Sequence, residues 1–272
     1  MEKIVLITGA NQGIGLAMAK LLIQRAPEYS KIIFTARNEE RGLRAVESLD
    51  CRDRLDFQVL DVTRIEQVRQ VVEYVRKTYG KLDVLVNNAG AGWHSGNEPL
   101  NAIRPYLGVN FYGMKNVTDE FLDLIPNDGH IINLSTVLSL PTHVKDDRLN
   151  RFLCDPQLSM QSLLEKVQEF ESLGEDWKEK GWKLEGSGVY GISKAFVNAY
   201  SMILHRDLTS ANRNIKVNAV HPGWVKTTMG GSQAPLEPEQ GAEVPLSLLF
   251  QHSNISGKYL SKETCIDLTN LT

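Results

Sequence analysis

The first fifteen residues constrain the fold more than any other part of the sequence. Ile4–Ile7 is a short, wholly apolar run, which predicts a parallel strand buried on both faces. Gly9, Gly13 and Gly15 follow it, and a helical apolar pattern comes next. In a strand, glycine-rich turn and helix, the backbone can approach a pyrophosphate and the free N–H groups of the helix start point at it. We therefore predict a nucleotide site here, the alternative being a glycine-rich surface turn.

Composition excludes several classes of protein. The sequence has 30 Lys and Arg against 33 Asp and Glu, a net charge of −3, so no basic surplus exists to bind nucleic acid. No apolar run is long enough to span a bilayer. Cys51, Cys154 and Cys265 are far apart and odd in number, which favours reduced thiols over a disulfide framework. Because the chain begins directly with a needed strand, we expect no signal peptide and a cytoplasmic protein.

Apolar strand-like runs alternate with helical patterns along the whole chain. Besides 4–7, the expected strands are 31–35, 55–60, 82–86, 130–134, 215–220 and 257–261. This alternation predicts an α/β fold with a Rossmann-type, doubly wound sheet of seven mainly parallel strands and helices on both faces. We expect one domain over residues 1–272.

A charged insertion at about 141–187 interrupts the alternation. It contains one amphipathic helix, with Leu163, Leu164, Val167 and Phe170 on one face. A lid or surface excursion and a packed hairpin of helices are both consistent with this pattern.

Polar and small residues follow the expected strands, where a doubly wound sheet binds its ligands. An arginine after the second strand accommodates the 2′-phosphate of NADP, whereas an acid would bind the free hydroxyl of NAD. Arg37 stands there, with Arg41 one turn later, so we predict NADP(H) rather than two merely solvated arginines. Asp61, after the third strand, is expected to touch the adenine edge, to cap the next helix, or both.

Carbonyl reduction needs a hydride donor and an acid that protonates the developing alkoxide. Tyr190 and Lys194 are four residues apart and share one face of an expected helix. The lysine charge would lower the tyrosine pKa from its usual value near ~10. A Ser or Thr after the fifth strand would hold the carbonyl oxygen. Asn110 stands among apolar helical neighbours, which indicates either a buried polar role or a helix kink.

Together, these motifs resemble the short-chain dehydrogenase/reductase family over nearly the whole chain. The resemblance rests on residues 8–15 (TGANQGIG), 87–90 (NNAG), Asn110, 190–194 (YGISK) and 222–223 (PG). Within the family, the chain is similar to monomeric NADPH-dependent carbonyl reductases in 35–37, 82–86, 222–225 and the insertion. The insertion of that branch covers a surface through which relatives associate, so the resemblance implies a monomer.

The resemblance also implies a set of roles. Tyr190 would be the acid, Lys194 would lower its pKa and bind the nicotinamide ribose, and Asn110 would hold a relay water. Thr136, Trp224 and Met229 would contact the substrate, an aromatic or quinone-like ketone or aldehyde, and no metal is expected. The residues implied in cofactor binding are Gly9, Asn11, Gln12, Gly13, Ile14, Gly15, Arg37, Asp61, Val62, Asn88, Ala89, Gly90, Tyr190, Lys194, Pro222, Gly223, Val225 and Thr227.

Two positions depart from the family pattern. Thr136 stands where the family has its substrate-binding serine, and we expect it to serve while the neighbouring Ser135 points toward the core. His221 stands where carbonyl reductases often have cysteine. Two other functions stay open: an alcohol or steroid dehydrogenase working oxidatively, and a nucleotide-binding sensor that has lost turnover.

Overall fold

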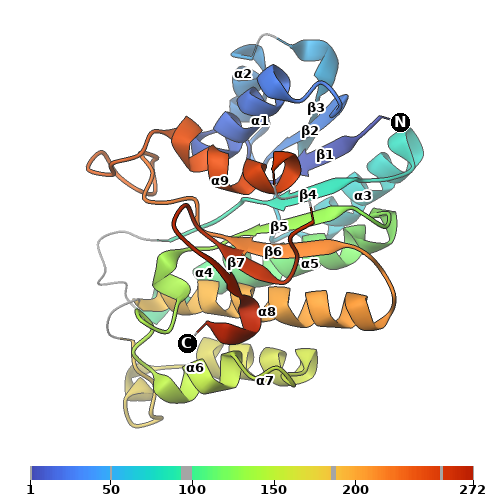
Figure 1. Cartoon of the computed structure of the whole chain (residues 1–272). Helices are drawn as coiled ribbons and strands as arrows, with labels where there is room; N and C mark the ends of the chain where they lie inside the picture. The colour runs from blue at the N-terminus through green and yellow to red at the C-terminus, as the bar shows by residue number, and fades with distance from the viewer. Residues whose placement is uncertain (1, 50, 93–99, 185–187, 252–253, 272) are drawn as a thin grey trace.

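One sheet of eight strands organises the computed structural model, which describes residues 2–49, 51–92, 100–184, 188–251 and 254–271 (Figure 1). The strand order is β3-β2-β1-β4-β5-β6-β7-β8. The strands are β1 (Ile4–Ile7), β2 (Lys31–Ala36), β3 (Leu55–Val59), β4 (Val84–Asn87), β5 (His130–Leu134), β6 (Lys216–Val220), β7 (Lys258–Leu260) and β8 (Cys265–Asp267).

The predicted doubly wound, mainly parallel sheet is confirmed, but the predicted number of seven strands is wrong. The additional strand is β8, which pairs with β7 in antiparallel orientation at the edge of the sheet. Its three residues, Cys265–Asp267, are exposed or half-buried. They form no apolar run, so the sequence pattern carries no strand signal there.

Helices cover both faces of the sheet, and the alternation of side chains along β1 decides which helices each residue meets. Val5 and Ile7 face the helices α1 and α9, whereas Leu6 faces α3, α5 and α8. The helices are α1 (Gly13–Arg25), α2 (Glu39–Glu47), α3 (Ile65–Tyr79), α4 (Ile103–Leu107), α5 (Met114–Phe121), α6 (Asp147–Leu153), α7 (Met160–Glu171), α8 (Gly188–Ser210) and α9 (Pro238–Phe250). Within the described residues, none of these helices is long and apolar enough to cross a membrane.

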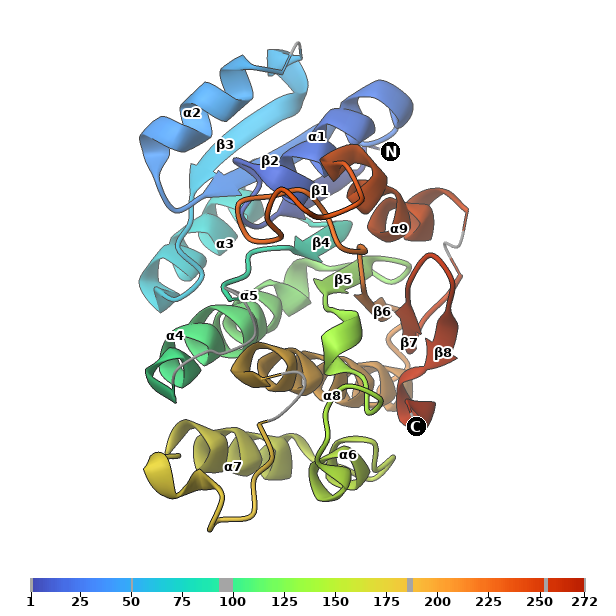
Figure 2. The same cartoon turned by 90° about the vertical axis from the view of Figure 1, so that its left-hand side faces the viewer.

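The insertion forms a pair of helices that pack on the outer side of α8. Figures 1 and 2 both show α6 and α7 beside α8, on the side away from the sheet. Phe170 of α7 is fully buried, and its ring centroid lies 4.9 Å from that of Trp182 and 5.7 Å from that of Phe196 in α8. Of the two alternatives for residues 141–187, this arrangement agrees with a packed pair of helices rather than a lid. Residues 185–187 lie outside the described part of the chain. The single-domain assignment stays a prediction.

A buried chain of hydrogen bonds runs along one face of the sheet, from α5 past the ends of β4 and β5 to α8. The side-chain amide of Asn87 donates to Thr118 Oγ1 and to Asn133 Oδ1, each at 2.8 Å. Asn133 Nδ2 donates in turn to Ser201 Oγ at 2.8 Å. All four side chains are buried, so each bond satisfies a group that would otherwise be costly to desolvate. This network fixes α8 relative to β4 and β5, at the edge where the strands end.

Candidate active site

The glycine-rich turn after β1 is packed tightly against the end of β4. A Cβ at Gly15 would lie only 2.6 Å from Asn88 Nδ2 and 2.7 Å from the Gly9 carbonyl oxygen, so no larger residue fits. Asn88 Nδ2 donates to the carbonyl oxygens of Thr8 and Gly9 at 2.8 and 3.0 Å. The Thr8 hydroxyl accepts from the backbone N–H groups of Asn88 and Ala89, each at 3.0 Å. These bonds tie the end of β4 to the end of β1.

The first backbone N–H groups of α1 have no acceptor within the helix, as in any α-helix. Gln12 is the N-cap, but its side chain makes no capping hydrogen bond, and the first turn of the helix carries no acidic residue. The methyl group of Thr227, on the loop after β6, lies 2.9 Å from the position a Cβ of Gly13 would take. Such a helix start, enclosed by a glycine turn and a second loop, fits the pyrophosphate of a dinucleotide. Asn11 and Ile14 are half-buried and lie at the same helix start, where they too were predicted to contact the dinucleotide.

Arg37, Asp61 and Val62 lie at the other end of the nucleotide site, after β2 and β3. Arg37 is exposed directly after β2, and Asn38 caps α2 by accepting from the Arg41 backbone N–H at 2.9 Å. Asp61 Oδ1 accepts from the N–H and hydroxyl of Thr63 at 3.0 and 2.7 Å.

The alternative that Asp61 caps α3 is wrong. The N-cap of this helix is Arg64, and no side chain caps it; Asp61 instead holds the turn before the helix. Val62 is buried, and a Cβ at Gly113 would lie 2.7 Å from its side chain, so Val62 turns its side chain toward the core.

The loop after β6 closes on itself. Val225 is buried and bridges to Leu236, and the Leu236 N–H donates to the Trp224 carbonyl oxygen at 3.2 Å. The Trp224 indole is 51% exposed, and its N–H donates to the Gly230 carbonyl oxygen at 2.8 Å. Figure 2 shows this loop, in orange, in front of β1. The loop also carries Pro222, Gly223, Thr227 and the half-buried Met229.

The α8 helix places Lys194 against the end of β5. The lysine is 4% exposed, and Nζ donates to the Leu134 carbonyl oxygen at 2.7 Å. Burial lowers the pKa of the Lys194 ammonium to about 8. Tyr190 lies one turn earlier on the helix, and the Tyr106 ring of α4 meets its ring edge to face, with centroids 6.4 Å apart.

Asn110 lies in a π-helical turn, Gly108–Gly113, and is 1% exposed. Its Oδ1 accepts from the Ala91 N–H at 2.8 Å, while Nδ2 donates to the Ala91 carbonyl oxygen and to Ser193 Oγ at 2.8 and 2.9 Å. Asn110 is therefore the buried polar group of the first alternative, and the irregularity of the helix is a π-helical turn. Local π turns of this kind are frequent at functional sites.

The hydroxyls that follow β5 differ in their partners. Thr136 Oγ1 accepts from the Leu138 N–H at 3.3 Å, and its own proton is in no hydrogen bond among the residues that the structure describes. Ser135 Oγ, by contrast, donates to Asn198 Oδ1 of α8 at 2.7 Å and is 4% exposed. Ser135 thus points toward the core, as expected, and Thr136 keeps a donor for a ligand.

His221, the second departure from the family pattern, precedes Pro222. Burial lowers the pKa of its imidazole to about 4, so the side chain is neutral near pH 7. Its Nδ1 is buried and has no partner within the described part of the chain.

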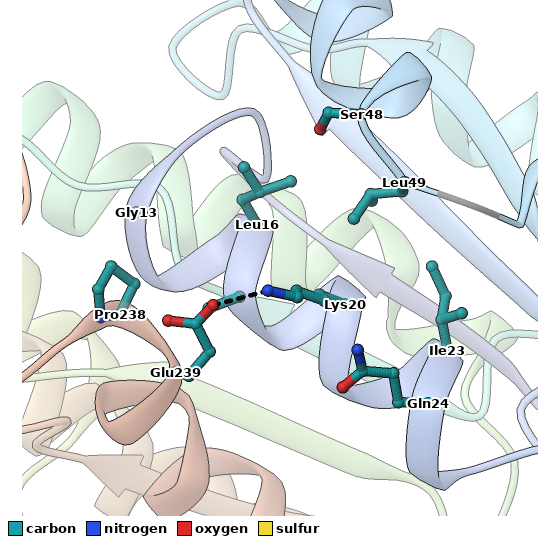
Figure 3. A pocket seen from close by; sticks show the side chains of 10 residues that line it. Gly13, Leu16, Lys20, Ile23, Gln24, Ser48, Leu49, Pro238 and Glu239 are labelled. Atoms are coloured by element: carbon teal, nitrogen blue, oxygen red, sulfur yellow. Dashed lines mark hydrogen bonds and ion pairs between the residues drawn. The ribbon is translucent and has the colours of Figure 1, made fainter.

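A hollow of about 420 Å³ lies outside this group of residues, on the outer face of α1. Figure 3 shows Lys20 of α1 and Glu239 of α9 ion-paired across it at 3.0 Å. Its lining reaches the nucleotide turn only at Gly13 and includes neither Tyr190 nor Lys194. The hollow is therefore not part of the candidate reaction centre.

Gly92 is not among the site residues predicted from the sequence, although it follows the NNAG motif by one residue. Its φ is +127°, and a Cβ there would lie 2.5 Å from Tyr190 Cδ2 and 3.1 Å from Tyr106 Cε2. The missing side chain leaves the space that the Tyr190 ring fills.

We expect Gly92→Ala to displace the Tyr190 ring and to lower the turnover of a carbonyl substrate about 10²-fold, because misplacement of a reacting group by about 1 Å has that effect. Affinity for NADPH should stay within about 3-fold of the unaltered value, measured by fluorescence titration. Gly80→Ala is the matched control, since Gly80 also has a positive φ (72°) but meets nothing within 4 Å. Equal losses in both variants would contradict this role for Gly92.

Comparison with known proteins places this geometry in a family. Residues 3–144 match the model of the short chain dehydrogenases, and residues 178–258 match that of the enoyl-(acyl carrier protein) reductases. Carbonyl reductase [NADPH] 1 of Sus scrofa is 35% identical to this chain, and the match covers 94% of this chain and 90% of the relative. Carbonyl reductase [NADPH] 1 of Homo sapiens is 33% identical, and the match covers 94% of each protein. Salutaridine reductase from Papaver somniferum superposes with a TM-score of 0.81, at 25% identity over 94% of this chain and 98% of its own. The chain belongs to the short chain dehydrogenase family.

Proposed function

We propose that the protein reduces carbonyl compounds to alcohols with NADPH. The observation that carries the proposal is the placement of Tyr190 and Lys194 on one face of α8, with Lys194 bonded to the end of β5, directly before Thr136. Asn110 joins the turn after β4 to the same helix, and that turn packs against a helix start that fits a dinucleotide. The relatives named carbonyl reductase [NADPH] support this activity, and the exposed Arg37 after β2 supports NADP(H) over NAD(H).

In this reaction NADPH, when bound, supplies the hydride. The Thr136 hydroxyl donates to the substrate carbonyl oxygen and orients it. Tyr190 gives its phenolic proton to the oxygen as negative charge develops there. The Lys194 ammonium, held by the Leu134 carbonyl oxygen, lowers the pKa of the tyrosine and binds the nicotinamide ribose.

Asn110 and Lys194 both border Gly90, so a water between them can return a proton toward Tyr190. A Cβ at Gly90 would lie 3.5 Å from Asn110 Oδ1 and 3.8 Å from Lys194 Nζ.

The substrate we propose is an aromatic ketone or aldehyde, or a quinone. The half-exposed indole of Trp224 supports an aromatic ligand, since it offers a flat apolar surface on the loop after β6. We also propose a cytoplasmic monomer. Its support is that α6 and α7 cover the outer side of α8, and that Cys51, Cys154 and Cys265 are free thiols.

The direct test is oxidation of NADPH at about 340 nm with a panel of quinones, aromatic aldehydes and ketosteroids. We expect Tyr190→Phe to lower kcat about 10³-fold, because a positioned general acid contributes about 10²–10⁴-fold, and to leave NADPH affinity nearly unchanged. Tyr112→Phe, which alters a tyrosine bonded to Glu171 instead, is the matched control and should keep full turnover. Tight NADPH binding with no turnover in the unaltered protein would favour the sensor alternative.

The lowered pKa of Lys194 predicts a pH dependence. The ammonium is charged below about pH 8 and loses its proton as the pH rises through that value, so its effect on Tyr190 is lost on the alkaline side. We expect kcat/KM for NADPH, which reports the free enzyme, to fall about tenfold per pH unit above pH 8. Lys194→Arg keeps its charge and should move the fall to higher pH. A profile that stays flat to about pH 9.5 would contradict the assignment.

A further inference from the structure

We propose that Asn198 is a positioning residue, which holds the Thr136 hydroxyl at a fixed place relative to Tyr190. This inference rests on the proposed function. Tyr190, Lys194 and Asn198 follow one another at intervals of four residues on α8, so all three lie on the helix face that meets the end of β5. Tyr190 and Lys194 are assigned to the reaction, whereas Asn198 has no assigned role.

Asn198 uses both ends of its amide to hold the turn that follows β5. Its Oδ1 accepts from Ser135 Oγ at 2.7 Å, and its Nδ2 donates to Ser139 Oγ at 2.8 Å. Ser139 Oγ donates to the Thr136 carbonyl oxygen at 2.5 Å, and the Ser139 N–H donates to the same oxygen at 3.1 Å. Asn198, Ser135 and Ser139 are each 3–4% exposed, so water does not compete for these bonds.

The geometry requires an amide at position 198. A carboxylate could accept from Ser135 but could not donate to Ser139. Alanine would remove both bonds from α8 and leave the two serines only the contact between their hydroxyls, 3.1 Å apart, and the bond from Ser139 to Thr136. Since Ser135 is committed to Asn198, this bond also explains why Thr136, the neighbouring residue, is the one that keeps a proton for the substrate.

Two anchors on α8 therefore enclose Thr136. The Lys194 ammonium holds the Leu134 carbonyl oxygen on one side, and Asn198 holds Ser135 and Ser139 on either side of Thr136. Threonine has few allowed χ1 rotamers, so a fixed backbone at Thr136 also fixes the direction of its hydroxyl. The separation of the two groups that meet the carbonyl oxygen, Thr136 and Tyr190, is thereby set through Asn198.

A double-mutant cycle between Asn198 and Thr136 tests this role. If Asn198 acts through Thr136, Asn198→Ala should lower kcat/KM for the carbonyl about 30-fold when Thr136 is present. The same change in a Thr136→Ala background should cost less than about 3-fold, because the group being positioned is gone. NADPH affinity should not change. Asn198→Asp, which keeps the acceptor and loses the donor, should show the same coupling.

Ser201→Ala is the matched control. Ser201 is a buried polar residue of the same helix face but bonds to Asn133, not to the turn of residues 135–139. Its effect on kcat/KM should be equal in both backgrounds. Where Asn198→Ala does not yield folded protein, Ser139→Ala removes a single hydroxyl and should couple to Thr136 in the same way.

If Asn198→Ala lowered kcat/KM equally with and without Thr136, the inference would be overturned and the proposed function would stand. A variant that lost only affinity for NADPH would have the same meaning. Absence of carbonyl turnover in the unaltered protein would overturn both.

Discussion

The bond from the Lys194 ammonium to the Leu134 carbonyl oxygen is the contact on which the rest of the site depends. It joins α8, which carries Tyr190, to the end of β5, which leads to Thr136. A buried lysine is costly unless its charge is satisfied, and the backbone carbonyl at the carboxyl end of β5 supplies the acceptor. The bond from Asn133 to Ser201 holds the same helix further along its length. These bonds fix the position of the turn after β5 relative to α8.

The nucleotide side of the site depends on the reversal of strand order between β1 and β4. These strands are neighbours in the sheet, but β1 is followed by β2 on one side and β4 is followed by β5 on the other. The turn after β1 and the turn after β4 therefore lie next to each other at the carboxyl ends of the strands. Thr8 and Asn88 bond the two turns to each other, and Gly15 leaves the room that this requires. Asn110, through Ala91 and Ser193, then joins the β4 turn to α8. The two halves of the site are therefore parts of one hydrogen-bonded assembly.

Much of the fold could be predicted because parallel strands buried on both faces are continuous apolar runs, as in Ile4–Ile7. The edge strand β8 could not, since it is half-exposed and has no such run. The role of Asp61 before α3 could not be predicted either, because its carboxylate can cap the helix or hold the preceding turn and spacing does not distinguish the two. The positions of Gly92 and Asn198 depend on contacts with Tyr190 and with residues 135–139, which only the folded chain brings together.

The central claim is that this arrangement directs a hydride to a carbonyl carbon and a proton to its oxygen. The most direct measurement uses NADPH deuterated at the transferring position of nicotinamide C4, with mass spectrometry of the alcohol formed from an aromatic ketone. The account predicts one deuterium bound to the former carbonyl carbon and a hydroxyl proton derived from solvent. An alcohol without deuterium at that carbon, or NADPH that binds and is never oxidised with any carbonyl, would contradict it.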